Sequence, residues 1–187
     1  MKKLLLVAVM VLTSAMTFAQ QKEGTLTIQP KVGLNIASLT DYDDSDPRFG
    51  VVAGAEFMYQ ATDMVGLSFG ALYSMQGAKY DKATTKLDYI NIPILANVYV
   101  APGFAVKLGL QPGFNVNSKA KAKSNGVSVE ADLDAKTVDL SIPIGLSYEF
   151  NNFVIDGRYN WGLTKVYKND DCKNSVFQIT LGYKLPL

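Results

Sequence analysis

The residue types that most enzymes use for acid–base and nucleophilic chemistry are scarce in this chain. Its 187 residues include no histidine and a single cysteine, Cys172. A histidine general base is therefore excluded, and one cysteine supplies neither an intrachain disulfide nor a cysteine-based zinc site. An Asp-only or Lys-based site is the one enzymatic alternative left open. We predict no catalytic residues, no metal site and no cofactor.

One short segment, Asp41-Tyr42-Asp43-Asp44-Ser45-Asp46, gathers oxygen ligands of the kind that calcium prefers. It lacks the glycine and the terminal glutamate of an EF-hand loop, so we interpret it as a solvated acidic loop. The whole chain carries 18 basic and 17 acidic residues, and this balance leaves no net field that would recruit a nucleic acid.

The N-terminal residues have the composition of an export signal. Lys2 and Lys3 precede an apolar stretch at 4–16, which ends in the small-x-small sequence Thr17-Phe18-Ala19. We expect residues 1–19 to be a signal peptide and residues 20–187 to form one domain. A retained anchor is the alternative, but about 13 apolar residues fall short of the ~20 that a spanning helix needs.

After residue 20 the dominant pattern is a period of two, not of 3.6. Eight runs alternate apolar and polar side chains, and each is long enough for the ~9–11 residues of a tilted membrane strand. The connections at 60–64, 101–103 and 151–152 are short, whereas those at 39–47, 77–86, 118–136 and 165–174 are long. These features predict an all-β fold, an eight-stranded antiparallel up-and-down transmembrane β-barrel.

The apolar members of these runs carry no charge, and most of their aromatic residues fall near the run ends. Two aromatic girdles at the lipid headgroups have this pattern, whereas a lipocalin-like soluble barrel would place the apolar set inside around a ligand. The predicted short-turn girdle contains Phe57, Tyr59, Phe104, Tyr148, Phe150, Phe153 and Tyr183. The predicted long-loop girdle contains Phe49, Tyr73, Phe114, Tyr159, Trp161 and Phe177.

The polar members are rich in Gly, Ser and Asn and include four positive and four negative side chains. Unpaired charge is costly in a narrow lumen, so we expect an ion-pair network there. Its predicted members are Lys31, Glu56, Lys107, Asp139, Glu149, Asp156, Arg158 and Lys184.

A symmetric final hairpin would place Asp156 beside Lys184, with Arg158 one step above and Glu149 nearby across the 151–152 turn. This network would act as a plug, because eight strands leave room only for side chains, or alternatively as an ion-selecting constriction.

Four prolines interrupt strand patterns, although a closed barrel has no free edge on which to place them. They are Pro30, Pro93, Pro112 and Pro143. Bulges or frayed strand ends would accommodate them.

Several motifs make the chain resemble the outer-membrane β-barrels of Bacteroidetes-type bacteria, the PorT-like barrels. They are Phe18-Ala19-Gln20, Lys31-Val32-Gly33-Leu34-Asn35, Leu87-Asp88-Tyr89-Ile90-Asn91-Ile92-Pro93-Ile94, Arg158-Tyr159-Asn160-Trp161-Gly162-Leu163 and Leu181-Gly182-Tyr183-Lys184. The resemblance implies an outer-membrane location and the barrel fold, and it brings no catalytic residues. One departure is the C-terminus: many such barrels end in Phe, whereas this chain ends Leu185-Pro186-Leu187.

In the longest connection, Lys119, Lys121 and Lys123 precede Glu130, Asp132 and Asp134. These lysines could contact lipopolysaccharide phosphates, although a solvated, self-neutralising hairpin is the simpler interpretation. Cys172 lies in the last long connection, where we expect an incidental exposed thiol rather than an intermolecular disulfide.

The expected function is a non-enzymatic outer-membrane barrel with four extracellular loops and a structural, adhesive or surface-interaction role. The alternatives are a narrow pore or secretion component, and a periplasmic small-molecule carrier. Expected partners are outer-membrane lipid and lipopolysaccharide, the barrel-assembly machinery, and an unidentified extracellular or secretion partner; the chain is expected to be a monomer.

Overall fold

The computed structural model describes residues 22–40, 46–80, 83–124, 127–167 and 171–187. The predicted signal peptide and most of the acidic loop, residues 41–45, lie outside these ranges. Within them, no helix has the length and apolarity needed to cross a membrane.

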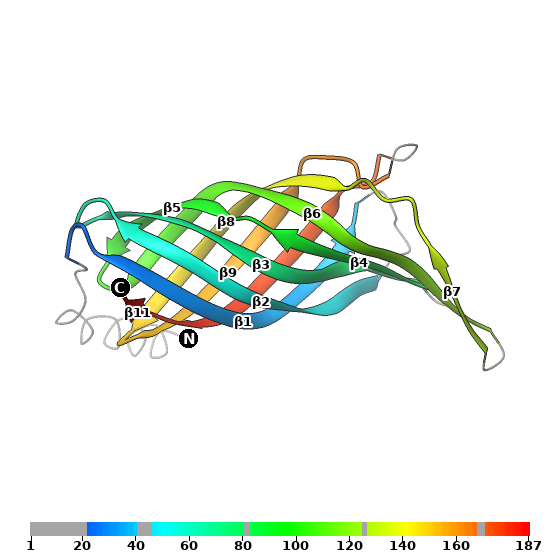
Figure 1. Ribbon diagram of the computed structural model, residues 1–187, viewed down its shortest axis with the longest axis horizontal. Helices are drawn as coiled ribbons and strands as arrows, with labels where there is room; N and C mark the ends of the chain where they lie inside the picture. Colours follow the sequence, from blue (N-terminus) through cyan, green and yellow to red (C-terminus); the bar gives the residue numbers. More distant parts are fainter. Residues whose placement is uncertain (1–21, 41–45, 81–82, 125–126, 168–170) are drawn as a thin grey trace, which may run out of the picture.

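The described chain forms one closed antiparallel sheet (Figure 1). Its strands are β1 (Leu26–Leu39), β2 (Asp46–Gln60), β3 (Val65–Lys79), β4 (Ala83–Asn91), β5 (Ile94–Ala101), β6 (Phe104–Ser124), β7 (Val127–Asp132), β8 (Val138–Phe150), β9 (Phe153–Gly162), β10 (Asn174–Tyr183) and β11 (Leu185–Pro186). Strand β1 pairs with β2 on one side and with β10 and β11 on the other, which closes the ring.

Two barrel strands are each divided into two segments. Strands β4 and β5 both lie between β3 and β6, and β11 continues β10 along β1. Strand β7 pairs with β6 alone and stands outside the ring. The barrel therefore has eight strands, which confirms the predicted fold class.

The two faces of the wall differ as the alternation predicts. Val32 and Leu34 are 56% and 58% exposed on the outer surface, whereas the next residue, Asn35, faces the lumen and is fully buried. The same pattern continues around the ring, so a wide apolar band faces outward. A water-soluble barrel with its apolar set inside would have the opposite arrangement.

Two of the four prolines, Pro93 and Pro30, lie beside interruptions in the strands. Pro93 occupies the gap between β4 and β5, next to Ile92, whose N–H donates to the carbonyl oxygen of Pro112 at 2.8 Å. Pro30 is part of β1 and lies opposite the interruption between β10 and β11. At that interruption the Lys184 N–H donates to Asn152 O at 2.7 Å instead of to β1. These positions need no N–H donor, so the ring stays closed.

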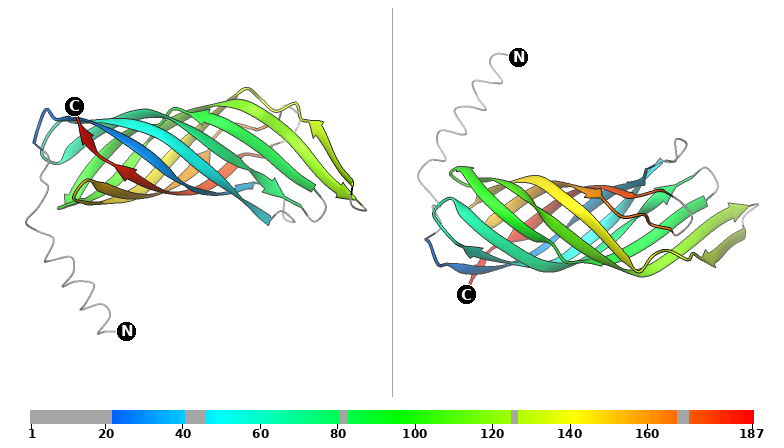
Figure 2. Two further views of the ribbon diagram at one scale, coloured as in Figure 1. Left: turned by 60° about the horizontal axis from the view of Figure 1, so that its bottom comes forward. Right: turned by 90° about the horizontal axis from the view of Figure 1, so that it is seen from above.

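The connection predicted at 118–136 contains the hairpin that was expected there. Strand β6 runs for 21 residues, beyond the rim of the barrel, and β7 folds back along its last part, from Lys119 to Ser124 (Figures 1 and 2). Strand β4 pairs with the other edge of this extension, up to Ala83 against Ala122. A three-stranded sheet of β4, β6 and β7 therefore projects from the long-loop end.

The connection between β9 and β10 folds across the long-loop mouth. The Val166 N–H donates to Cys172 O at 2.9 Å, and the Lys173 N–H donates to Thr40 Oγ1 at 3.0 Å. Cys172 is fully buried, so the prediction of an exposed thiol is wrong. It packs in an apolar group that we call the mouth cluster, which contains Leu39, Ala78, Leu87, Tyr89, Val166 and Cys172.

Closure of the ring requires a glycine in β1. A β-carbon added to Gly33 would lie 1.9 Å from the backbone oxygen of Ile179 in β10, and only backbone movement would relieve that contact. We expect Gly33→Ala to prevent pairing of the first and last strands. The unheated protein should then lose the faster gel mobility that a folded barrel shows relative to the heated chain.

The matched control is Gly157→Ala, because a β-carbon there meets no atom within 4 Å. This variant should keep the heat-dependent mobility of the wild type. Normal folding of Gly33→Ala would show that the close approach of β1 and β10 is not required.

Candidate functional site

The lumen contains a group of five ionised side chains from four strands, which we call the central charge cluster. Arg158 donates to Asp156 from Nε at 2.8 Å and from Nη2 at 2.7 Å, and its Nη1 donates to Glu56 Oε1 at 3.0 Å. Lys31 Nζ lies 2.7 Å from Glu56 Oε2, and Lys107 Nζ donates to Asp156 Oδ2. One guanidinium thus joins two carboxylates, and each carboxylate also contacts a lysine.

The cluster is removed from solvent, with the Arg158 side chain 0% exposed. Three cations, Lys31, Lys107 and Arg158, face two anions, so its formal charge is +1. Buried ions are tolerated when they are paired and hydrogen-bonded, and removing one partner leaves an uncompensated charge. The geometry therefore suits a rigid closure of the lumen.

A second ion pair lies nearer the short turns, and we call it the rim pair. Lys184 Nζ contacts Glu149 Oε2, and the Tyr99 hydroxyl donates to Glu149 Oε1 at 2.7 Å. The expectation that Asp156 lies beside Lys184 is wrong, because β9 and β10 align Asp156 with Thr180.

The cause of this difference is the connection before β10. Strand β9 ends at Gly162, before the predicted start of the connection at residue 165, whereas β10 begins at Asn174, so Trp161 pairs with Ser175. The shift is an even number of residues, and the inward or outward direction of every side chain is therefore preserved.

Asp139 is the eighth predicted lumen charge, and it lies apart from both groups. It accepts a hydrogen bond from Thr164 Oγ1 at 2.6 Å, and none of the ion pairs found within the described residues includes it. The structure thus brings together five of the eight residues centrally and two at the rim. Residues 22–40, 46–80, 83–124, 127–167 and 171–187 contain no group of three or more His, Cys, Asp or Glu that could hold a metal ion.

Sequence reasoning missed a polar group near the long-loop end of the wall. Asp88 Oδ2 accepts hydrogen bonds from the Tyr73 hydroxyl at 3.1 Å and from Asn117 Nδ2 at 2.9 Å, and Arg48 Nη1 lies 3.8 Å from Asp88 Oδ1. Leu87 and Tyr89 face inward, so the alternation places Asp88, which lies between them, on the outer side of β4. A charged residue at such a position is the sequence feature that could have revealed this group. Both ionised residues, Arg48 and Asp88, lie at the ends of the predicted strands, just after the predicted connections at 39–47 and 77–86, and no role was predicted for them.

The thirteen predicted girdle residues occupy outward positions in the strands. Ten of them are exposed, whereas Phe57, Phe104 and Tyr148 are half-buried. Phe153 and Tyr183 form an edge-to-face pair with ring centroids 5.1 Å apart beside the 151–152 turn. Aromatic rings at such positions suit the boundary between hydrocarbon and headgroups.

Lysines gather on the outward side of the projecting sheet, and we call this surface the lysine face. Lys86 Nζ and Lys121 Nζ lie 3.3 Å and 3.5 Å from the same Glu130 oxygen, and Lys119 stands between Lys86 and Asp132 in register. The hydrogen bond and charge of Lys86, followed by those of Lys121, hold the pKa of Glu130 below its ordinary value. The side chain of Lys123 lies outside the described part of the chain.

Comparisons with known proteins agree with this architecture. Residues 18–168 match the model of the family described as outer membrane protein beta-barrel domain. Among curated proteins, none is significantly similar in sequence to this chain.

Solved structures of small barrels are similar in fold. Ail, the attachment invasion locus protein of Yersinia pestis, superposes with a TM-score of 0.55 at 20% identity, over 88% of this chain and 100% of Ail. Ail has also been crystallised with the heparin analogue sucrose octasulfate. Neisserial surface protein A gives a TM-score of 0.56 at 19% identity, over 87% of this chain and 100% of that protein. At these identities the likeness shows the fold alone.

Proposed function

The chain belongs to the family of outer-membrane β-barrel domains, and from that premise we propose that it is a non-enzymatic surface protein whose projecting sheet binds anionic saccharides. The outer membrane is its location, and the apolar band of the barrel contacts membrane lipid. The ligands proposed are sugars that carry sulfate or phosphate groups, such as sulfated polysaccharides or the headgroup of lipopolysaccharide.

The observation that carries this proposal is the lysine face. Two ammonium groups, those of Lys86 and Lys121, share the single carboxylate of Glu130, and all three side chains are 31–42% exposed. Together with Lys119 and Asp132, the surface keeps an excess of one positive charge. A sulfate or phosphate oxygen can accept hydrogen bonds from these lysines in place of Glu130.

The position of this surface fits such a ligand. The sheet stands beyond the long-loop rim (Figure 1), and in outer-membrane barrels the long loops face the outside of the cell. Ail, a barrel of similar fold, has been crystallised with a heparin analogue, which makes heparin a suitable first probe.

Replacing Lys86, Lys119 and Lys121 together by Gln should weaken binding of the purified barrel to immobilised heparin by at least about tenfold, because several charge-assisted contacts are lost. Binding to purified lipopolysaccharide is measured in parallel. The comparison shows whether the barrel prefers sulfated polysaccharide or the phosphates of lipopolysaccharide. High salt should weaken wild-type binding in both arms, since exposed charges are screened.

Glu130→Gln is the matched control on the same surface. It releases Lys86 and Lys121 from their shared carboxylate, so it should tighten binding while leaving the barrel folded. Unchanged binding by the triple lysine variant, or weaker binding by Glu130→Gln, would refute the proposal.

We also propose that the lumen is a plug and conducts no ions. Support comes from the central charge cluster, whose salt bridges link strands on different sides of the ring. The second candidate function is a narrow pore or secretion component. It is favoured by the buried amides of Asn160 and Gln178, which have no hydrogen-bond partner within the described residues and would suit a hydrated path.

Asp156→Asn separates these candidates. It leaves Lys31, Lys107 and Arg158 facing Glu56 alone, so the free energy of unfolding in urea should fall by about 3–5 kcal/mol, with no conductance in a planar bilayer. Asp139→Asn is the control, because Asp139 belongs to neither ion-pair group and the amide oxygen can still accept from Thr164, so stability should change by no more than about 1 kcal/mol. A large conductance with unchanged stability would favour the pore.

Four further proposals come from the sequence. We propose that residues 1–19 are removed as a signal peptide and that the alternating Tyr183, Leu185 and Leu187 are recognised by the barrel-assembly machinery. The motifs shared with PorT-like barrels support membership of that subgroup. The folded barrel is proposed to be a monomer.

A further inference from the structure

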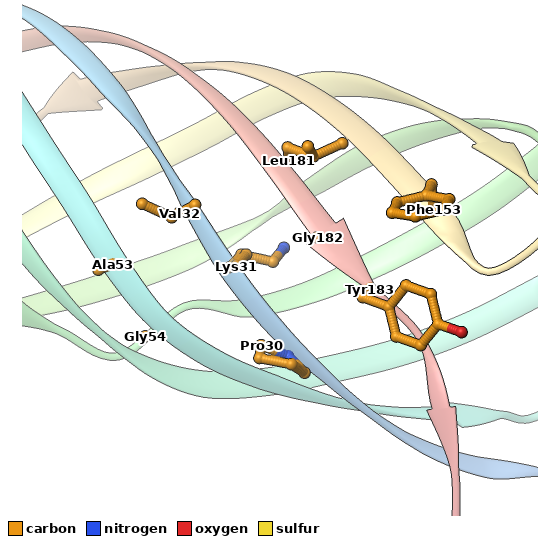
Figure 3. A pocket seen from close by; sticks show the side chains of 9 residues that line it. All are labelled: Pro30, Lys31, Val32, Ala53, Gly54, Phe153, Leu181, Gly182 and Tyr183. Carbon is orange, nitrogen blue, oxygen red and sulfur yellow. The ribbon is translucent and has the colours of Figure 1, made fainter.

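The outer wall of the barrel is hollowed over the seam between its first and last strands (Figure 3). The hollow has a volume of about 500 Å³, within the ~300–1,000 Å³ typical of ligand pockets. Its sides come from β1, β2, β9 and β10, and the residues that shape it are Pro30, Val32, Ala53, Phe153, Leu181 and Tyr183. We call it the seam groove.

A small side chain at an outward position creates this groove. Ala53, which pairs in register with Val32, projects only a methyl group to the outer surface, and the two glycines paired with Lys31, Gly54 and Gly182, occupy inward positions. A β-carbon added to Gly182 would lie 3.4 Å from the β-carbon of Lys31, which shows how closely the lysine stem lies behind it. The ammonium group of Lys31 pairs with Glu56 inside the lumen and presents no charge to the groove.

Larger side chains border the hollow on the outer surface. Val32 and Leu181 rise from adjacent strands, and the edge-to-face pair of Phe153 and Tyr183 closes the side nearest the 151–152 turn. The groove is therefore elongated, apolar along its sides and ends at an aromatic pair.

We propose that the seam groove is a binding site for one acyl chain of a phospholipid in the leaflet that meets the short turns. The groove lies within the apolar band that faces hydrocarbon and continues that lipid-facing surface. The aromatic pair sits at the level of the short-turn girdle, where headgroups begin, and Tyr183 supplies a hydroxyl at that boundary.

Shape, and not the hydrophobic effect, selects this occupant within the membrane. Lipid chains are as apolar as the groove, so burial alone gives no preference for binding there. An unfilled hollow would leave the facing carbon atoms of Val32, Leu181 and Phe153 without contacts, whereas a flexible chain can follow the groove. A flat, rigid protein surface would not enter between these side chains.

Ala53→Phe tests the proposal, because Ala53 faces outward in the groove and its replacement fills the space without reaching the lumen charges. The purified mature barrel in mild detergent is titrated with dipalmitoyl phosphatidylethanolamine, and bound lipid is counted by native mass spectrometry. The wild type should retain one lipid, and Ala53→Phe should bind it about tenfold more weakly.

Ala71→Phe is the matched control. Ala71 is also exposed on the outer wall, in β3, and does not line the groove, so this variant adds the same ring elsewhere on the apolar band. It should retain lipid as the wild type does, and both variants should keep heat-dependent gel mobility.

Equal lipid retention by the two variants would overturn the proposal. So would a dimer mass in the wild type that only Ala53→Phe abolishes, because the groove would then be an interface between copies of the chain. Because the seam groove and the lysine face lie at opposite ends of the barrel, failure of one proposal leaves the other intact.

Discussion

A barrel wall in hydrocarbon must satisfy every backbone N–H and C=O within the protein, and this constraint governs the rest of the structure. Closure between β1 and β10 meets it, since neither strand is left with a free edge along the membrane. Closure then divides all side chains into two sets. One set meets lipid, and the other is enclosed in a bore too narrow for much water.

The enclosed set is arranged in layers along the bore. From the short turns upward, these are the rim pair of Lys184 and Glu149, the central charge cluster, amide side chains such as those of Asn160 and Gln178, and the mouth cluster. The rim pair and the central charge cluster consist of buried ion pairs. The mouth cluster consists of apolar side chains, so the two ends of the bore are packed by different physical means.

The alternation of side chains made the faces of the wall predictable from the sequence. The position of a residue in the alternating pattern was enough to predict that Val32 faces outward and Glu56 inward, because side chains in a strand alternate with a period of two. The alternation could not give the register between β9 and β10, because that register depends on where each strand ends. For that reason Asp156 was predicted beside Lys184, although these strands align it with Thr180 and it joins Lys31 and Lys107.

Features that depend on tertiary packing were the hardest to predict from the sequence. Cys172 lies in a polar stretch of sequence, and its burial follows from contacts with residues from β1 and β4 that no local pattern encodes. The hairpin at 118–136 was expected from its opposite charges. Its continuity with β6 was not, because Lys119 and Lys121 do not continue the apolar alternation of that strand. Pro30 argued against a strand on the sequence alone, because the break between β10 and β11 that it faces belongs to a strand far away in the sequence.

The direction of the apolar side chains is the central claim, and methyl NMR of the barrel in lipid nanodiscs tests it most directly. The methyl protons of Ile155, Ile179 and Leu181 should show cross-relaxation with lipid acyl chains. Those of Val52 and Val154, which are equally apolar but buried in the lumen, should show none. Lipid contacts from Val52 and Val154, with none from the other three, would contradict the account.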